Sequence, residues 1–398
     1  MHFRGKKIKL NIITLCLLIL CLSAFPAHAQ KETKKSPAKK ETGTIKIGVI
    51  GPATGDLADY GQKTLAGVMT AVNEINAKGG ILGKELEVLP YDDKNTRGGA
   101  VNAAIKLIEQ HKVIGIISAP TGWSSFAPTF AANSAKTIYL SAGTRRKLGK
   151  TGSFIFRNSL PDDIAAEDTI AYCVDKLGYK NYALITSMDN DYSLTLSAYF
   201  KKGILDKKAK IIDEVHTGEG YTDFKDTISG LKKKSGGAID AIIYTGGPKE
   251  AALIMEEARR QELKAALIGG EDLMVPELWE TGKDAVIGTI AYNSFAAESK
   301  TKEAAKFIEL YKKEKNELPD GRAALAYDAA LLLAEAIKTA KSTDRVRVRD
   351  SLVSLKGFRG ATGSMSFRQG GEPLKHPFIF KLEKTAGSYS FKLVEEKN

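Results

Sequence analysis

From residue 44 onwards, short apolar runs alternate with segments of helical periodicity. The β-branched run at 45–50 ends at Gly51-Pro52, and the segment after it repeats apolar residues every three or four positions until Gly79-Gly80. Runs of the first kind predict strands, and segments of the second kind predict helices. In this half the predicted strands are 45–50, 86–91, 113–118 and 137–140, and the predicted helices are 65–75, 101–110 and 124–134.

The same alternation starts again after Pro161. Predicted helices cover 164–177, 194–203, 222–233 and 249–261, and predicted strands cover 182–186, 210–215, 241–244 and 266–269. Strands joined by helices of about 10–15 residues favour parallel sheets, so two successive units of this kind predict an α/β protein with two lobes. Two more helices, 302–315 and 323–339, precede turn-rich β-runs after Gly360.

The start of the chain has the pattern of a secretory signal peptide. Basic residues precede an apolar run at 10–22, and Ala27-His28-Ala29 places small residues where a signal peptidase cleaves. The run is shorter than the roughly 20 residues that a membrane-spanning helix needs. We therefore predict a signal peptide at 1–29 and export to the periplasm. A membrane anchor is the alternative, and Cys16 and Cys21 offer a less suitable lipid attachment site, since Leu precedes each.

Composition narrows the function further. Beyond residue 29, Cys173 is the single cysteine of the sequence, so an internal disulfide is excluded. Part of the formal charge of +12 lies in the predicted signal peptide and in residues 30–43. These residues carry five Lys and two Glu, a composition that predicts a disordered linker. The other charges are spread along the chain. We therefore expect no nucleic-acid partner, because such a surface needs clustered basic residues.

Known catalytic patterns are absent from the sequence. Cys173 lies in an apolar helical pattern that predicts a core position, and the histidines beyond residue 29 (His111, His216 and His376) are far apart. The segment 79–84 lacks the spacing of a phosphate loop. We expect no catalytic residues, no metal and no cofactor.

Two loops suit the binding of a small polar molecule. In a parallel sheet, ligands bind at the carboxyl ends of the strands. The loop 119–124 follows one predicted strand and opens a helix, whose free N–H groups favour a carboxylate. Ser141-Ala142-Gly143-Thr144 follows another strand with small residues and a hydroxyl. The alternatives are that Thr121 or Ser124 caps its own helix and that the second loop is an ordinary polar turn.

Several motifs in this order resemble one known family. The motifs are IKIGVIGPATGDLADYG (45–61), INAKGGILGKELEVLPYDD (75–93), NDYS (190–193), YTGG (244–247), GGEDL (269–273), ALAYDAALLLAEAI (324–337) and FRGATGSMSFRQGG (358–371). Together they make the chain similar to the periplasmic leucine/isoleucine/valine-binding proteins, which belong to the type I amino-acid and amide receptors of ABC transporters. The resemblance covers nearly all of 45–393.

The resemblance implies a fold and a domain organisation. The fold is α/β, with two Rossmann-like lobes joined by three hinge crossings near residues 160, 292 and 376. The first lobe would comprise 44–160 plus 293–375, and the second 161–292 plus 376–398.

The resemblance also implies a ligand-binding site between the lobes. The family's ligand contacts fall on Tyr60, Thr121, Gly122, Trp123, Ala142, Thr144, Tyr192 and Glu271. In these roles Thr121, the Ala142 backbone and Thr144 bind the carboxylate and ammonium of an amino acid, and Glu271 pairs with the ammonium. The alternatives are a solvated acid in a turn for Glu271, and packing at the lobe edge for Trp123 and the two tyrosines.

The implied function is a periplasmic receptor that binds a branched-chain or other amino acid, or a related amide, and delivers it to the permease subunits of an ABC transporter. We expect it to act as a monomer. Pro248 stands where branched-chain receptors commonly have an aromatic residue, so the ligand stays open. A ligand-sensing subunit of a signalling system is one alternative, and an exported enzyme is another.

Overall fold

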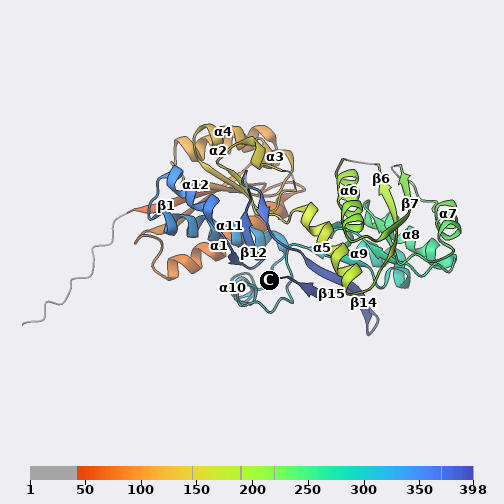
Figure 1. Ribbon diagram of the computed structural model, residues 1–398. Helices are drawn as coiled ribbons and strands as arrows, with labels where there is room; N and C mark the ends of the chain where they lie inside the picture. Colours follow the sequence, from red (N-terminus) through yellow and green to blue (C-terminus); the bar gives the residue numbers. More distant parts are fainter. Residues whose placement is uncertain (1–42, 146, 189–190, 219, 369, 398) are drawn as a thin grey trace, which may run out of the picture. The chain divides into compact units, whose positions relative to one another are not determined.

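The computed structural model describes residues 43–145, 147–188, 191–218, 220–368 and 370–397 (Figure 1). The predicted signal peptide and all of the predicted linker except residue 43 lie outside these ranges. Residues 41–398 form one compact unit. No helix in the described ranges is long and apolar enough to cross a membrane.

The first lobe is built on a parallel five-stranded sheet with the order β2-β1-β3-β4-β5. Its strands are β1 (Thr44–Gly51), β2 (Glu85–Asp92), β3 (Gly115–Ser118), β4 (Ile138–Ser141) and β5 (Ile155–Arg157). Its early helices are α1 (Ala58–Ala77), α2 (Arg97–Glu109), α3 (Trp123–Phe126), α4 (Thr129–Ser134) and the 3₁₀ turn η1 (Gly149–Thr151). Four of the five strands match the predictions from sequence, as do α1 and α2.

Both faces of this sheet are buried, because successive side chains of a strand point to opposite sides. Ile117 and Leu140 face α1 and α11 (Gly321–Ala340), whereas Ile116 and Tyr139 face α2. The contact between α1 and α11 is close, since a Cβ atom at Gly67 would lie 2.1 Å from the carbonyl oxygen of Ala323. Small residues at this crossing therefore fix how the returning chain packs on the first lobe.

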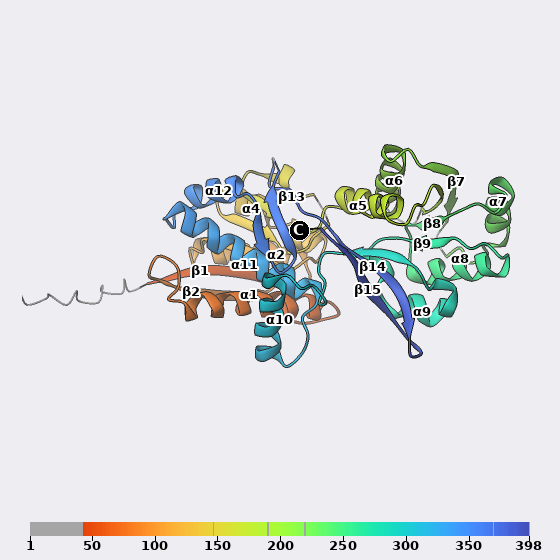
Figure 2. The same ribbon diagram turned by 60° about the horizontal axis from the view of Figure 1, so that its bottom comes forward.

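The second lobe is built on a seven-stranded sheet with the order β15-β14-β10-β9-β8-β6-β7. The strands are β6 (Asn181–Ser187), β7 (Lys210–Thr217), β8 (Ala241–Tyr244), β9 (Ala266–Ile268), β10 (Ile290–Asn293), β14 (Phe378–Thr385) and β15 (Ser388–Glu396). Its helices are α5 (Asp162–Asp175), α6 (Asp191–Asp206), α7 (Lys225–Ser235), α8 (Pro248–Arg260), α9 (Pro276–Gly282) and the 3₁₀ turns η2 (Glu271–Leu273) and η3 (Lys283–Val286). Strands β6 to β10 pair in parallel, and β14 and β15 form an antiparallel hairpin at the edge (Figure 2).

The remaining elements return to the first lobe. They are α10 (Lys302–Lys315), α11, α12 (Arg345–Ser354) and the small antiparallel sheet of β11 (Phe358–Gly360), β12 (Gly363–Phe367) and β13 (Pro373–Leu374). The chain thus passes between the lobes after β5, after β10 and after β13. The predicted two-lobed α/β fold is confirmed by these sheets, whereas the exact lobe boundaries stay a prediction.

A buried ionic cluster lies beside two of these passages. The Asp328 carboxylate accepts hydrogen bonds from the amides of Ala361 (2.7 Å) and Thr362 (2.8 Å). Lys375 is 1% exposed and donates to Thr362 Oγ1 (2.5 Å) and to the Asn158 carbonyl (3.4 Å). Burial lowers the pKa of Lys375 to about 8, although the Asp328 charge opposes the shift. These contacts tie the passage after β5 to the passage after β13.

Two predictions from the sequence concern the helix at 124–134 and the position of Cys173. The predicted helix 124–134 is two short helices, α3 and α4, because Pro128 lacks the amide hydrogen that a continuous helix needs. Cys173 is fully buried in α5, as predicted, and burial raises the pKa of its thiol.

Candidate ligand-binding cleft

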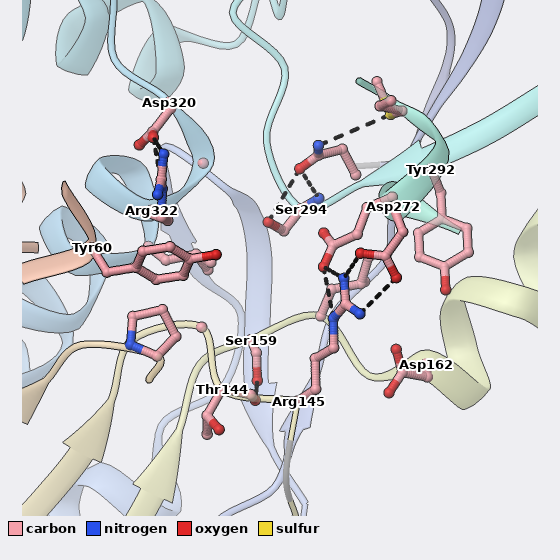
Figure 3. Close-up of a pocket in the computed structure, with 18 of the residues that line it drawn as sticks. Tyr60, Thr144, Arg145, Ser159, Asp162, Asp272, Tyr292, Ser294, Asp320 and Arg322 are labelled. Carbon is pink, nitrogen blue, oxygen red and sulfur yellow. Dashed lines mark hydrogen bonds and ion pairs between the residues drawn. The ribbon is translucent and has the colours of Figure 1, made fainter. Parts of the chain in front are cut away.

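A cavity of about 600 Å³ opens where the carboxyl ends of both sheets meet. Its lining comes from the start of α1, from the loops after β3, β4 and β5, from η2 and the end of β10, and from the start of α11 (Figure 3). Of the residues predicted for the site, Tyr60, Gly122, Thr144 and Glu271 line this cavity. Thr121, Trp123, Ala142 and Tyr192 lie next to it in the chain or in space but do not line it.

In the first loop, hydroxyl groups hold the backbone instead of facing the cavity. The amide of Thr121 donates to Ser125 Oγ (2.8 Å), and Ser124 Oγ donates to the carbonyl and hydroxyl oxygens of Thr121 (3.0 Å each). Gly122 follows with φ +66°, a conformation that glycine adopts readily, and presents backbone to the cavity. The Thr121 hydroxyl therefore accepts a hydrogen bond within this loop, and Thr121 does not line the cavity.

Trp123 does not line the cavity. Its side chain is 48% exposed, and the Arg97 guanidinium lies 4.4 Å from its ring centroid. The Phe126 ring packs edge-on against it at 5.7 Å. The sequence allowed Trp123 either to contact the ligand or to pack on the lobe, and these contacts favour packing on the lobe.

The second loop places Thr144 in the cavity lining. The Ala142 side chain is fully buried and its amide donates to the Ser118 carbonyl (2.9 Å), which fixes the loop on β3. Thr144 is 3% exposed, and its carbonyl accepts hydrogen bonds from Ser159 Oγ (2.6 Å) and Arg157 Nη1 (3.1 Å). With its carbonyl held in this way, Thr144 is fixed at the cavity wall.

Arg145 was not anticipated from the sequence. Its guanidinium donates to Glu271 Oε1 (2.7 Å from Nη2, 3.0 Å from Nε) and to both carboxylate oxygens of Asp272 (2.8 Å each). It also lies 4.6 Å from the centroid of the Tyr192 ring. Arg145 follows β4 of the first lobe, whereas its partners belong to the second lobe, so this network crosses the cleft (Figure 3). The adjacent Arg145-Arg146 after the predicted ligand loop was the sequence signal available.

Asp162 supplies a further carboxylate to the same end of the cleft. It begins α5, and Tyr192 Oη donates to its Oδ1 at 3.3 Å. Burial raises the pKa of Asp162 to about 6, because the nearby positive charges of Arg145 and Arg157 compensate for lost hydration only in part. The neighbouring Tyr292 is buried, and its hydroxyl has no hydrogen-bond partner among the described residues.

The other end of the cleft contains Tyr60 and Arg322. The Arg322 guanidinium lies 4.6 Å from the Tyr60 ring centroid, and its Nη2 is 2.7 Å from carboxylate oxygens of both Asp59 and Asp320. Asp320 also accepts a hydrogen bond from the amide of Ala323 (2.9 Å) and so caps α11. Both arginines of the cavity lining are thus already paired with acids.

Charge in the cavity favours a ligand that carries a positive group. Its ionisable lining consists of Arg145 and Arg322 against Asp162, Glu271, Asp272 and Asp320. An ammonium group would find carboxylates from the second lobe, and a carboxylate would find the Gly122 backbone and the Thr144 hydroxyl on the first. Within the described residues, no group of three His, Cys, Asp or Glu side chains could hold a metal ion.

The chain belongs to the periplasmic binding protein family, whose model matches residues 44–385. It is therefore a solute-binding protein of the two-lobed type I class, as the sequence motifs indicated. A leucine-, isoleucine-, valine-, threonine- and alanine-binding protein of Pseudomonas aeruginosa is 27% identical over 346 residues, which cover 86% of this chain and 91% of that protein.

Solved structures show the same similarity. A leucine-binding protein from Thermotoga maritima is 27% identical with a TM-score of 0.67, covering 88% of this chain and 98% of that one. Another similar structure is the substrate-binding protein of a branched-chain amino-acid transporter from Streptococcus pneumoniae, solved in complex with isoleucine. It is 27% identical with a TM-score of 0.66, covering 88% of this chain and 100% of that one.

Proposed function

We propose that this protein is the exported receptor of an ABC importer and that its ligand is an α-amino acid or a related amide, held between the two lobes. The observation that best supports this proposal is the cleft itself, which is lined by glycine and hydroxyl-bearing residues of the first lobe and by acidic residues of the second. The relatives that bind leucine, isoleucine and valine support an amino-acid ligand.

In the proposed complex the first lobe binds the ligand carboxylate. The Gly122 backbone and the Thr144 hydroxyl supply donors there, and Thr121 and Ala142 act indirectly by fixing the two loops. Tyr60 borders the ligand side chain, with Arg322 stacked on its ring. This assignment keeps the predicted residues but gives Thr121, Ala142 and Trp123 supporting positions.

The second lobe contributes the partner of the ligand ammonium. Glu271 and Asp162 both line the cavity at this end, and Tyr192 orients Asp162 through its hydroxyl group. Charge-assisted hydrogen bonds in a closed, water-poor cleft are stronger than neutral ones. The ligand would thus favour the closed form by its differential affinity for that form.

Closure then serves transport, because a permease can recognise the closed form. Export follows from the signal-like residues 1–29, whose removal leaves the Lys-rich lead and the two lobes. We propose that the receptor acts as a monomer and that its own steps, ligand binding and closure, make or break no covalent bond.

Mass spectrometry of the solute that co-purifies with the exported protein tests this proposal, followed by calorimetry against the individual amino acids and their amides. A 1:1 complex with an amino acid that is recovered unchanged is the expected result. Chemical conversion of the bound compound, or no binding of any amino acid or amide, would overturn the proposal.

A further inference from the structure

One buried hydroxyl group in the lining of the ligand cleft has no hydrogen-bond partner. Tyr292, in β10, is 1% exposed, and its Oη makes no hydrogen bond within the described part of the chain. Its ring packs in the core of the second lobe, with its centroid 6.5 Å from that of the Phe200 ring. Because a buried hydroxyl without a partner destabilises a protein, its place in the cavity lining indicates a contact with the ligand.

Glycine at position 270 keeps a side chain away from this hydroxyl group. A Cβ atom at Gly270 would lie 3.3 Å from Tyr292 Oη. Figure 3 shows the hydroxyl directed toward the side of the cleft on which Asp162 lies. Burial and the neighbouring acidic groups raise the pKa of Tyr292, so the phenol keeps its proton and can both donate and accept a hydrogen bond.

The Asp162 carboxylate is the acidic group on this side of the cleft. It begins α5, and the dipole of that helix favours its ionised form. Tyr192 donates to it at 3.3 Å, and among the described residues no cation forms an ion pair with it. The arginines whose charges act on it, Arg145 and Arg157, are each held by another carboxylate at 2.7 Å.

A cationic hydrogen-bond donor would satisfy both groups. Its N–H groups could donate to Tyr292 Oη and to the Asp162 carboxylate, and its charge would reduce the excess of acids in the cavity lining, where four face two arginines. An aliphatic side chain would leave the hydroxyl without a partner, and a site built for a ligand donor rejects analogues that lack it. Since Glu271 alone can pair with the α-ammonium group, this second cation belongs to the ligand side chain.

We propose that Tyr292 and Asp162 form a subsite for a positively charged side chain, so that the ligand is a basic amino acid of the lysine or arginine class. This inference rests on the proposed function, which places an α-amino acid in the cleft. The ligand carboxylate stays at Gly122 and Thr144, and the side chain extends toward Tyr292. Such a preference would separate this chain from relatives that are named for leucine, isoleucine and valine.

Calorimetry with matched ligands tests the proposal. L-Norleucine is lysine without the side-chain ammonium, and L-citrulline is arginine with a neutral urea group in place of the guanidinium. The wild type should bind L-lysine or L-arginine at least about tenfold more tightly than the neutral analogue. Tyr292→Phe should weaken binding of the basic ligand by about three- to tenfold without weakening that of L-norleucine, and Asp162→Asn should lose more.

Tyr182→Phe is the matched control. The Tyr182 hydroxyl of β6 is also buried without a partner in the ranges that the structure describes, but Tyr182 does not line the cleft. Both Phe variants keep the ring and remove an unpaired hydroxyl, so thermal unfolding should show each to be at least as stable as the wild type. Tyr182→Phe should bind every ligand like the wild type. Equal affinities of Tyr292→Phe and Tyr182→Phe for the basic ligand would overturn the subsite.

The choice of ligands separates this inference from the proposed function. Tighter binding of L-leucine or L-isoleucine than of L-lysine and L-arginine would overturn the inference and leave the amino-acid receptor intact. Equal binding of the basic ligands and their neutral analogues would do the same. If no amino acid or amide binds, both proposals fail.

Discussion

The Arg145 guanidinium of the first lobe lies 2.7 Å from the Glu271 carboxylate of the second lobe, across the ligand cleft. It thereby occupies the carboxylate that we assign to the ligand ammonium, while a second pair with Asp272 (2.8 Å) keeps it on the same 3₁₀ turn. A ligand ammonium can share Glu271 without removing Arg145 from its other partner. Arg145 therefore links the two lobes directly.

Loss of the linking arginine should favour the open form of the ligand-free protein. Each partly exposed ion pair contributes about 0.2–1 kcal/mol, so the loss of both pairs in Arg145→Ala should reduce the ratio of closed to open forms by about two- to thirtyfold. Fluorescence transfer between labels on the two lobes measures this change. Lys150→Ala, an exposed substitution in η1, is the control. Equal transfer in Arg145→Ala and wild type would contradict the role of Arg145.

Removal of either proposed ligand contact should weaken binding. Thr144→Ala and Glu271→Ala should each reduce affinity for an α-amino acid at least about tenfold, or about 1.4 kcal/mol, because each removes one proposed hydrogen bond to a charged group of the ligand. Calorimetry gives both values directly. Glu277→Ala, on the exposed face of α9, should bind normally. Unchanged affinity in both cleft variants would refute the site assignment.

Ligand binding should depend on pH through Asp162. The pKa of Asp162 is about 6 in the ligand-free cleft, and an ammonium group binds its ionised form better. Affinity should therefore be highest above pH 6 and fall as the pH decreases toward 5, whereas Asp162→Asn should have lower affinity and a flatter profile. Calorimetry across this range is the measurement, and identical pH profiles in the two proteins would exclude Asp162 from the site.

The same pKa shift has the opposite effect on the stability of the ligand-free protein. The folded-state pKa lies above the ordinary value, so the folded form binds the proton more tightly, and this stabilising contribution is lost as the pH rises from about 4 through about 6. Asp162→Asn should consequently raise the melting temperature at pH 8 more than at pH 4. A larger rise in melting temperature at pH 4 than at pH 8 would contradict this prediction.

The buried pair at the lobe passages should dominate stability. Lys375→Met leaves the Asp328 carboxylate buried without that cation, which costs about 3–5 kcal/mol. The double variant Asp328→Asn, Lys375→Met should recover part of this loss. Because the pKa of Lys375 is lowered when folded, the wild type should gain stability relative to Lys375→Met as the pH rises above about 8. Denaturant unfolding of the three proteins measures each difference.

Local periodicity was sufficient to predict most strands of the two sheets and the loops at the cleft, whereas β5, β10, α9 and α12 were not predicted. The β-branched run of β1 and the apolar face of α1 each depend on neighbours a few residues away, so the sequence encodes them directly. The short β5 escaped detection because three residues carry too little periodicity.

Side-chain pairing across the cleft could not be predicted in this way. Arg145 and Glu271 are 126 residues apart, and their meeting depends on how the two lobes are joined. The direction of a side chain within a predicted loop could not be predicted either. Thr121 accepts a hydrogen bond from Ser124, and the Trp123 ring packs against Arg97. A loop can be located from its flanking strands, whereas its rotamers follow from tertiary packing.

The seven-stranded sheet receives β14 and β15 from the end of the chain, and β10 pairs with β14. A ribosome therefore releases nearly the whole polypeptide before the edge of this sheet can be completed. Until the hairpin arrives, the second lobe lacks this edge. A stop codon before β14 should therefore yield a chain that proteases degrade.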